Sequence, residues 1–239
     1  MASKEELREL VWQQNMRLPS EGLVSLTWGN ASGMSEDGLI AIKPSGVPYL
    51  EMTPEDIVVI DLDGKVVEGT LRPSVDTATH LELYRAFPHV RGVVHVHSTY
   101  ATAFSQARRP LDCLGTTHAD HFAGPVPVIR PLTLEEVSEA YEVNTGKLIV
   151  ERFRGDGIDP VRMPAAFSAG HAPFIWGTSA KNAVDNAVAL EKSAEMAVLT
   201  VLVAGGAPSI LEPHMLEIHT ERKHGANAYY GQSGGRTAF

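Results

Sequence analysis

Two histidines one residue apart close a short apolar run, and this pattern constrains the chain more than any other. Residues 93–98 read VVHVHS, so His95 and His97 alternate with valines. In a β-strand, side chains at positions i and i+2 point to the same face. The pattern therefore predicts a strand that presents two imidazoles side by side, which is half of a tetrahedral metal site. For an isolated His-X-His pair, structural histidines are an equally good explanation, so the remaining ligands decide.

A third histidine and an aspartate are candidates for those ligands. His171 follows the predicted strand 165–168 and lies beside Gly170 and Pro173, in a loop of the kind that carries ligands on a rigid scaffold. Asp76 opens a predicted helix over residues 76–87. Three imidazoles and one carboxylate suit a borderline divalent ion such as Zn²⁺, with Mn²⁺, Co²⁺ or Ni²⁺ as alternatives.

Length and composition indicate one globular domain, because 239 residues with 44% hydrophobic and 21% charged side chains can form a full core. A net charge of −9 argues against nucleic-acid binding. A single cysteine, Cys113, suits a reducing compartment. The charged N-terminus lacks the apolar core of a signal peptide, and no apolar stretch reaches the ~20 residues of a membrane span. We therefore expect a cytoplasmic protein that binds neither nucleic acid nor membrane.

Hydrophobic periodicity predicts helices and strands interspersed along the chain, which favours an α/β fold in one layered domain. The predicted helices cover residues 3–18, 76–87, 99–106, 133–144 and 179–202, and the predicted strands residues 39–43, 57–61, 65–69, 126–129 and 165–168, besides the one that ends in histidines. Thr133 and Glu136 form a capping-box pattern. Residues 27–33 and 44–46 predict turns of small residues, where backbone N–H groups can face a ligand. Residues 233–239 predict a flexible tail.

Several segments in one order are more specific than any single motif. They are residues 26–30 (LTWGN), 43–47 (KPSGV), 76–81 (DTATHL), 92–98 (GVVHVHS), 115–120 (GTTHAD), 171–174 (HAPF) and 223–232 (KHGANAYYGQ). With these segments the chain resembles the class II aldolase and epimerase family from about residue 23 to residue 232, and most closely its L-ribulose-5-phosphate 4-epimerases.

The resemblance implies a three-layer α/β/α fold with a central, mainly antiparallel sheet, a single domain over residues 1–239, and a homotetramer with active sites between neighbouring subunits. The implied metal ligands are Asp76, His95, His97 and His171. The implied substrate-binding residues, around the phosphate, are Gly29, Asn30, Lys43, Ser45, Gly46, Ser74 and Val75. The implied acid/base pair is Asp120 and Tyr230, donated by the adjacent subunit. Tyr229 is a rival for the phenol, since spacing alone does not separate adjacent tyrosines.

The implied reaction converts L-ribulose 5-phosphate to D-xylulose 5-phosphate, in pentose metabolism such as arabinose catabolism. The hydrogen on C4 is β to the ketone, so its removal would leave an unstabilised carbanion. Cleaving the C3–C4 bond instead places the charge on an enediolate, which a divalent cation stabilises as a Lewis acid. The other fragment, glycolaldehyde phosphate, then rotates and adds back through its opposite face. The C4 oxygen needs a different proton-transferring group on each side, and a carboxylate and a phenol meet that need.

Two alternatives remain open at this point. A sugar-phosphate aldolase of the same family, of the fuculose-phosphate type, usually has a glutamate at the position of Asp76; the shorter aspartate is better suited to holding metal. A non-catalytic module like the adducin head lacks the metal ligands that are present here. One departure concerns the phosphate: the epimerases usually have two serines before the metal aspartate, and here the pair is Ser74 and Val75. Loss of a hydroxyl that bonds phosphate typically costs about 1.5–3 kcal/mol.

Overall fold

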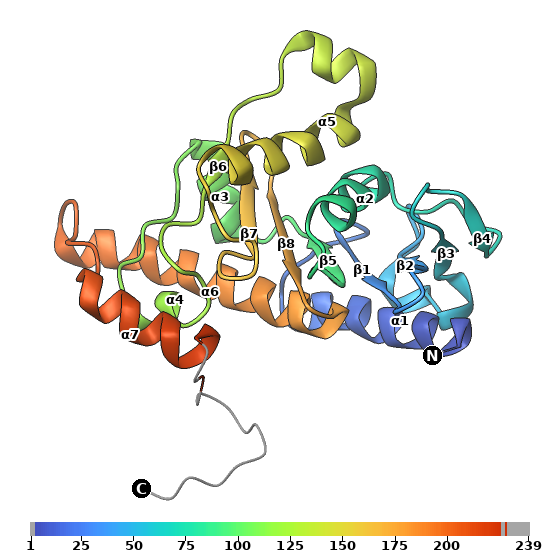
Figure 1. Cartoon of the computed structure of the whole chain (residues 1–239), viewed down its shortest axis with the longest axis horizontal. Coiled ribbons are helices and arrows are strands. Elements are labelled where there is room, and N and C mark those ends of the chain that lie inside the picture. The colour runs from blue at the N-terminus through green and yellow to red at the C-terminus, as the bar shows by residue number, and fades with distance from the viewer. Residues whose placement is uncertain (1–2, 226–227, 229–239) are drawn as a thin grey trace, which may run out of the picture.

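Short strands form one sheet in the computed structural model, which describes residues 3–225 and 228 (Figure 1). The described strands are β1 (Asn30–Met34), β2 (Ile40–Ile42), β3 (Val58–Ile60), β4 (Val66–Glu68), β5 (Gly92–His95), β6 (Val128–Ile129), β7 (Ala165–Ser168) and β8 (Pro173–Gly177). Across the described part of the chain their order is β4-β3-β2-β1-β5-β8-β7-β6. Neighbouring strands are antiparallel except for the pair β6 and β7, which is parallel. The prediction of a mainly antiparallel sheet is confirmed.

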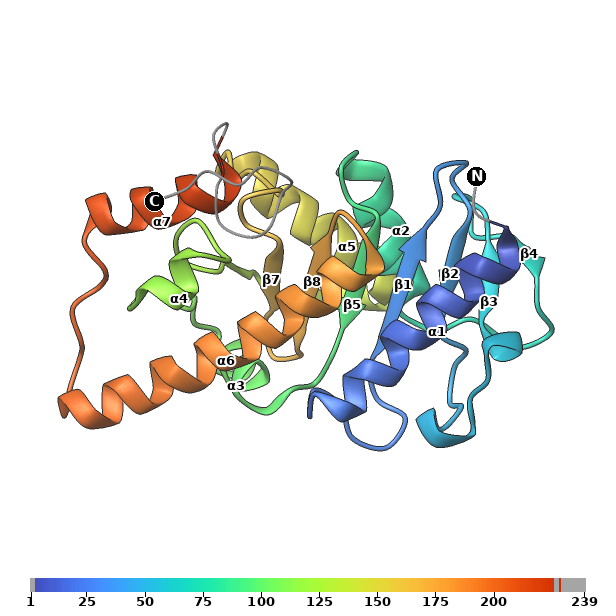
Figure 2. The ribbon, with the colours of Figure 1, turned by 90° about the horizontal axis from the view of Figure 1, so that it is seen from below.

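Helices cover both faces of this sheet. The described α-helices are α1 (Lys4–Ser20), α2 (Thr77–Ala86), α3 (Thr99–Ala107), α4 (Thr116–Ala119), α5 (Leu134–Gly155), α6 (Ala180–Ala204) and α7 (Pro213–His224), with 3₁₀ turns at Tyr49–Glu51 and Pro54–Asp56. Helices α1 and α6 lie on one face, and α2 and α5 lie on the other (Figures 1 and 2). The arrangement is the predicted three-layer α/β/α fold. None of the helices in residues 3–225 combines the length and the apolar character needed to span a bilayer.

Local signals in the sequence explain where several helices begin and end. Helix α5 begins with the predicted capping box, in which Thr133 and Glu136 exchange side-chain-to-backbone hydrogen bonds. Helix α6 ends at Gly205, which adopts a left-handed conformation with φ of 66°. Under α2 and α5, the rings of Phe87, Phe153 and Trp176 pack with centroids 5.1–5.6 Å apart. Aromatic packing of this kind joins the helical layer to β8.

The prediction of a turn over residues 27–33 was wrong for its second half, because β1 begins at Asn30 and is a central strand. Its small residues serve packing rather than a turn. A Cβ on Gly33 would lie 2.9 Å from a Val11 methyl carbon and 3.1 Å from the Ala180 Cβ. The small side chain therefore lets α1 and α6 approach the sheet closely.

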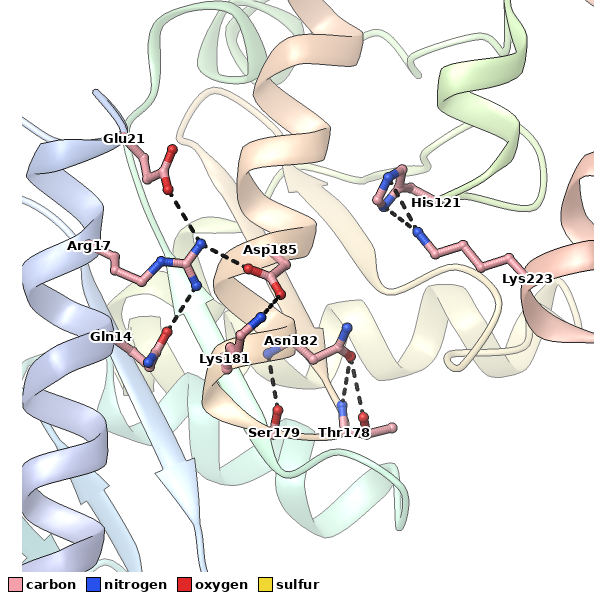
Figure 3. Close-up of polar contacts among 10 residues, drawn as sticks. All are labelled: Gln14, Arg17, Glu21, His121, Thr178, Ser179, Lys181, Asn182, Asp185 and Lys223. Atoms are coloured by element: carbon pink, nitrogen blue, oxygen red, sulfur yellow. Dashed lines mark hydrogen bonds and ion pairs between the residues drawn. The ribbon is translucent and has the colours of Figure 1, made fainter. Parts of the chain in front are cut away.

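Ion pairs also join α1 to α6 at the surface (Figure 3). Arg17 of α1 donates to Asp185 of α6 at 2.8 Å and lies 3.4 Å from Glu21. Lys181 pairs with the same Asp185 carboxylate at 2.7 Å. Because these side chains are partly exposed, each pair contributes at most about 1 kcal/mol, and the apolar contacts beneath them dominate.

Candidate metal centre

Three histidines converge at one end of the central strands. His95 is the last residue of β5, and His171 lies in the turn between β7 and β8. The prediction that one strand carries both His95 and His97 was wrong for His97, which lies two residues beyond the end of β5. Strand β8 pairs with β5 so that Phe174 lies opposite His95, which returns the turn to the same end of the sheet. The ring centroids are 4.9 Å apart in each of the three pairings. One ligand nitrogen from each ring lies within 4.8 Å of the others, a spacing that could hold one metal ion.

Hydrogen bonds show which nitrogen of His95 faces the centre of the cluster. Its Nδ1 lies 2.9 Å from the carbonyl oxygen of Pro173, which can only accept, so Nδ1 carries the hydrogen. The lone pair of the neutral ring is then on Nε2, which lies 3.2 Å from Nε2 of His97. Two nitrogens bound at about 2.1 Å from one Zn²⁺ with tetrahedral angles lie about 3.4 Å apart. The two imidazoles are therefore spaced as ligands of one cation.

Burial favours the neutral, metal-binding form of two of these imidazoles, His97 and His171. It lowers the pKa of His171 to about 4, with the neighbouring His95 and His97 acting in the same direction. Burial and then His95 also lower the pKa of His97. Both rings are consequently unprotonated at neutral pH, so a cation would not have to displace protons.

Asp76 lies at the start of α2, yet its carboxylate does not cap the helix. Instead Asp76 Oδ2 accepts a hydrogen bond from Asn30 Nδ2 at 2.8 Å, and the same amide nitrogen donates to Ser74 Oγ at 3.0 Å. Burial alone would raise the pKa of Asp76, but His95, His80 and the Asn30 amide together hold it below its usual value. Asp76 is therefore an ionised carboxylate beside the histidines, although it lies outside the group of ligand atoms within 4.8 Å found among the described residues.

A cavity of about 550 Å³ joins the histidines to the predicted phosphate residues. Its lining includes Gly29, Asn30, Lys43, Ser45, Gly46, Ser74, Val75, Asp76, His95, His97 and His171. Gly29 is required at its place for steric reasons, because its φ is 75° and an added Cβ would lie 2.8 Å from the His95 carbonyl oxygen. All predicted metal and substrate-binding residues thus share one cavity.

Lys43 contributes a basic side chain to this cavity. Its side chain is almost fully buried, with Nζ 3.4–3.5 Å from the carbonyl oxygens of Thr27 and Pro44 and 4.8 Å from the centre of the Tyr49 ring. Burial lowers the pKa of Lys43 to about 8. The backbone N–H of the neighbouring Ser45 donates to the Arg72 carbonyl, so Ser45 has its hydroxyl, not its amide, to offer a ligand.

Asp120 lies apart from this cavity, at the end of α4 where α7 packs on it. The guanidinium of Arg222 donates to both carboxylate oxygens, at 2.9 and 2.6 Å, and His219 Nδ1 lies 3.0 Å from Oδ1. Burial would raise the pKa of Asp120, but hydrogen bonds from Arg222 and His219 lower it overall. His121, which lies just after α4, contacts Lys223 of α7 (Figure 3). Tyr229 and Tyr230 lie outside the described residues.

One residue of the centre was missed from the sequence. The hydroxyl of Tyr141 lies 3.1 Å from His171 Nδ1. Tyr141 is thirty positions away from His171 and belongs to no recognisable motif, so no local pattern could have indicated the contact.

Comparison with known proteins agrees with this geometry. The model of the family described as class II aldolase and adducin N-terminal domain matches residues 9–198. The chain is 50% identical over 232 residues to "L-ribulose-5-phosphate 4-epimerase UlaF" of Salmonella paratyphi B, covering 95% of this chain and 99% of the relative. The protein of the same name from Salmonella typhi is 50% identical over 229 residues, with the same coverage.

Solved structures give the same fold. An L-fuculose 1-phosphate aldolase superposes with a TM-score of 0.77 and 27% identity, over 93% of this chain and 97% of the other. L-fuculose-1-phosphate aldolase from Thermus thermophilus superposes with a TM-score of 0.66 and 28% identity, over 85% and 98% of the two chains. The chain belongs to the class II aldolase and adducin family.

Proposed function

We propose that this protein is a metal-dependent L-ribulose-5-phosphate 4-epimerase, which interconverts L-ribulose 5-phosphate and D-xylulose 5-phosphate. The observation that carries the proposal is the convergence of three imidazoles in a cavity that also contains a buried lysine. The identity of 50% to proteins named as this epimerase favours it over other members of the family.

His95, His97, His171 and Asp76 would hold one divalent cation, with Zn²⁺ first and Mn²⁺, Co²⁺ or Ni²⁺ as alternatives. The donor set supports this assignment, because it combines neutral imidazoles with a carboxylate whose pKa is lowered. When bound, the cation supplies Lewis-acid stabilisation of the charge that C3–C4 cleavage leaves on the three-carbon fragment. The reaction otherwise depends on groups of the protein.

Lys43 would bind the phosphate, together with the hydroxyls of Ser45 and Ser74 and the turns at Gly29–Asn30 and Ser45–Gly46. The cationic form of Lys43 is needed for a strong, charge-assisted hydrogen bond to phosphate. Val75 is 66% exposed at the edge of the cavity and offers no hydrogen bond in the place where related epimerases usually have a second serine. A firm grip on phosphate keeps glycolaldehyde phosphate bound while it rotates.

Asp120 and Tyr230 would transfer protons at the C4 oxygen, one on each face of the aldehyde. Cleavage requires a base that takes the proton of the C4 hydroxyl, and re-addition requires an acid that returns one. The pairing of Asp120 with Arg222 supports its presence as a carboxylate. Because Asp120 lies away from the cavity of its own chain, we assign it to the site of an adjacent subunit.

A homotetramer with active sites between subunits would bring these groups together. Apolar side chains exposed towards the end of α6 support such an assembly, since Leu202 is 71% and Val203 90% exposed. Surfaces of this kind are typical of subunit contacts.

We further propose that residues 1–239 form one domain. The protein would act in the cytoplasm, on a pentose route such as arabinose catabolism. The unpaired Cys113 is consistent with a reducing compartment.

The deciding experiment is an assay of L-ribulose 5-phosphate conversion to D-xylulose 5-phosphate by the purified protein, with and without chelator. We expect activity that disappears with chelator and returns with Zn²⁺ or Mn²⁺. Full activity after removal of all metal would reject the proposal. Release of free dihydroxyacetone at the rate of substrate loss would instead identify a sugar-phosphate aldolase, the activity named for the structural relatives. A protein with neither metal nor sugar-phosphate affinity would be an adducin-like module.

A further inference from the structure

Helix α5 is interrupted immediately before the tyrosine that contacts the histidine cluster. Within Leu134–Gly155, Ala140 has φ of −164° and ψ of 80°, which are not helical values, so two helical segments meet at this residue. Tyr141 is the first residue of the second segment. Its hydroxyl lies 3.1 Å from His171 Nδ1, and the two ring centroids are 6.1 Å apart. The interruption therefore sets the direction in which this phenol points.

Hydrogen bonds hold the interruption in place from both sides. Asn144 Nδ2 donates to the Glu136 carbonyl at 2.8 Å, across the break. From α2, the Thr79 hydroxyl donates to the Glu142 carbonyl at 2.6 Å. Since α2 begins next to Asp76, the backbone around Tyr141 is tied to the element that carries the carboxylate of the proposed metal centre.

We infer that Tyr141 is a positioning residue for the proposed metal ligand His171, and this inference rests on the metal centre proposed above. The phenol oxygen accepts the Nδ1–H of His171, so the lone pair of Nε2 points towards His95 and His97. The carbonyl of Pro173 orients His95 in the same way, because it accepts the Nδ1–H of that ring. Metal-ligating histidines usually donate their second N–H to an acceptor of this kind, which fixes the ring and its tautomer.

The hydroxyl matters because, within residues 3–225, few other contacts orient the ring of His171. His95 is stacked on Phe174, with centroids 4.2 Å apart and planes inclined by 17°, and it is buried. His171 lies in a turn, is only partly buried, and makes tilted or edge contacts with its aromatic neighbours. Without an acceptor at Nδ1, its ring can rotate and turn Nε2 away from the cluster. Loss of such a partner typically weakens metal binding by 10–100-fold.

The test is the metal affinity of Tyr141→Phe, measured by competition for Zn²⁺ with a chromogenic chelator, with the absorption spectrum of the Co²⁺-loaded protein as a second readout. Tyr84→Phe is the matched control. Tyr84 is a buried tyrosine, whereas Tyr141 is partly buried, and the Tyr84 hydroxyl bonds Ser32 at 2.7 Å instead of a proposed metal ligand. We expect Tyr141→Phe to bind Zn²⁺ at least about 10-fold more weakly and to alter the Co²⁺ spectrum. Tyr84→Phe should keep the wild-type affinity and spectrum even if its thermal stability falls.

The outcomes separate this inference from the proposal on which it rests. A Tyr141→Phe protein with wild-type affinity and spectrum overturns the positioning role alone. An equal loss of affinity in both variants also overturns it, because the effect would then be general loosening of the fold. A wild-type protein that binds neither Zn²⁺ nor Co²⁺ overturns the metal centre itself.

Discussion

Replacing Gly146 with alanine should destabilise the protein, because an added carbon has no room between α5 and α2. A Cβ at this position would lie 2.6 Å from Glu82 Cβ, 3.0 Å from Glu82 Cγ and 3.1 Å from the Thr79 carbonyl oxygen. Carbon atoms in contact normally lie about 3.5–4.0 Å apart, so the helices would have to separate by about 1 Å. The nearest atoms are the Cβ of Glu82, which is fixed to the backbone, and a backbone oxygen of Thr79, and neither can move aside by rotation of a side chain.

The expected magnitude is the difference between two opposing effects. Alanine in place of glycine inside a helix favours folding by about 1 kcal/mol. Overpacking of a closely packed contact costs about 1–3 kcal/mol. Since the two helices are also joined by the Thr79–Glu142 hydrogen bond, we expect the cost to be in the upper part of that range and the free energy of unfolding to fall by about 1–2 kcal/mol.

Urea unfolding of the metal-free protein, followed by circular dichroism at one protein concentration, measures this change. Gly155→Ala is the control, because Gly155 ends the same helix and a Cβ there would meet nothing within 4 Å. It should be as stable as the wild type or slightly more so. Gly146→Ala should in addition bind Zn²⁺ more weakly, since the displaced helices carry Tyr141 and adjoin Asp76. Equal stability of Gly146→Ala and the wild type would refute the reasoning.

Three further predictions concern catalysis. His97→Asn should lower kcat/KM by at least about 100-fold, because loss of a metal ligand should cost more than loss of a ligand's hydrogen-bond partner. A smaller decrease of kcat/KM in the steady-state assay would exclude His97 as a ligand. Lys43→Met should raise KM for the sugar phosphate about 10–100-fold, the equivalent of a charge-assisted hydrogen bond of about 1.5–3 kcal/mol. Because the pKa of Lys43 is lowered to about 8, the wild-type lysine loses its proton as pH rises through that value, and kcat/KM should fall above it. This fall should be absent in the methionine variant, and its persistence would assign the titration to another group. Val75→Ser, which adds a hydroxyl beside Ser74 at an exposed position, should lower KM by up to about 10-fold, and an unchanged KM would place the phosphate elsewhere.

The parts of the fold that could be predicted are those with strong local signals. Valine-rich runs predicted β3 and β5, the apolar run AAFS predicted β7, and the pair Thr133 and Glu136 predicted the start of α5. Strand β1 was misread in part because its sequence, NASGM, is that of a turn. Its strand conformation comes from its neighbours, since it pairs with both β2 and β5, and its small residues fit under α1 and α6. Tertiary contacts here override local propensity.

The candidate site divides in the same way. The closeness of His95 and His97 was predictable from their spacing of two residues, although β5 ends at His95 and His97 lies just beyond it. His171 was predictable because it follows another strand. The contact of Tyr141 with His171 was not predictable, because it requires the interruption at Ala140 and the return of β8 alongside β5. Asn30 illustrates an intermediate case: its place in the cavity was predicted, but not its bonds to Ser74 and Asp76, which depend on the packing of β1 beside α2.

The arrangement of the cavity bears on the choice between epimerase and aldolase. Cleavage of a ketopentose 5-phosphate at C3–C4 gives two fragments, and one cavity of about 550 Å³ contains both the histidine cluster and Lys43. The three-carbon fragment and the phosphate of the other fragment can therefore be held at the same time by separate groups of one chain.

Inversion at C4 requires the aldehyde to turn over without leaving, so it must be held by its phosphate and not at C4. Lys43, buried among carbonyl oxygens and an aromatic ring, is the phosphate anchor that we propose for this rotation. An aldolase gains nothing from retaining this fragment, because turnover requires its release. On this proposal, the strength of the phosphate anchor, and not a metal centre that would serve both activities, is the property on which epimerisation depends.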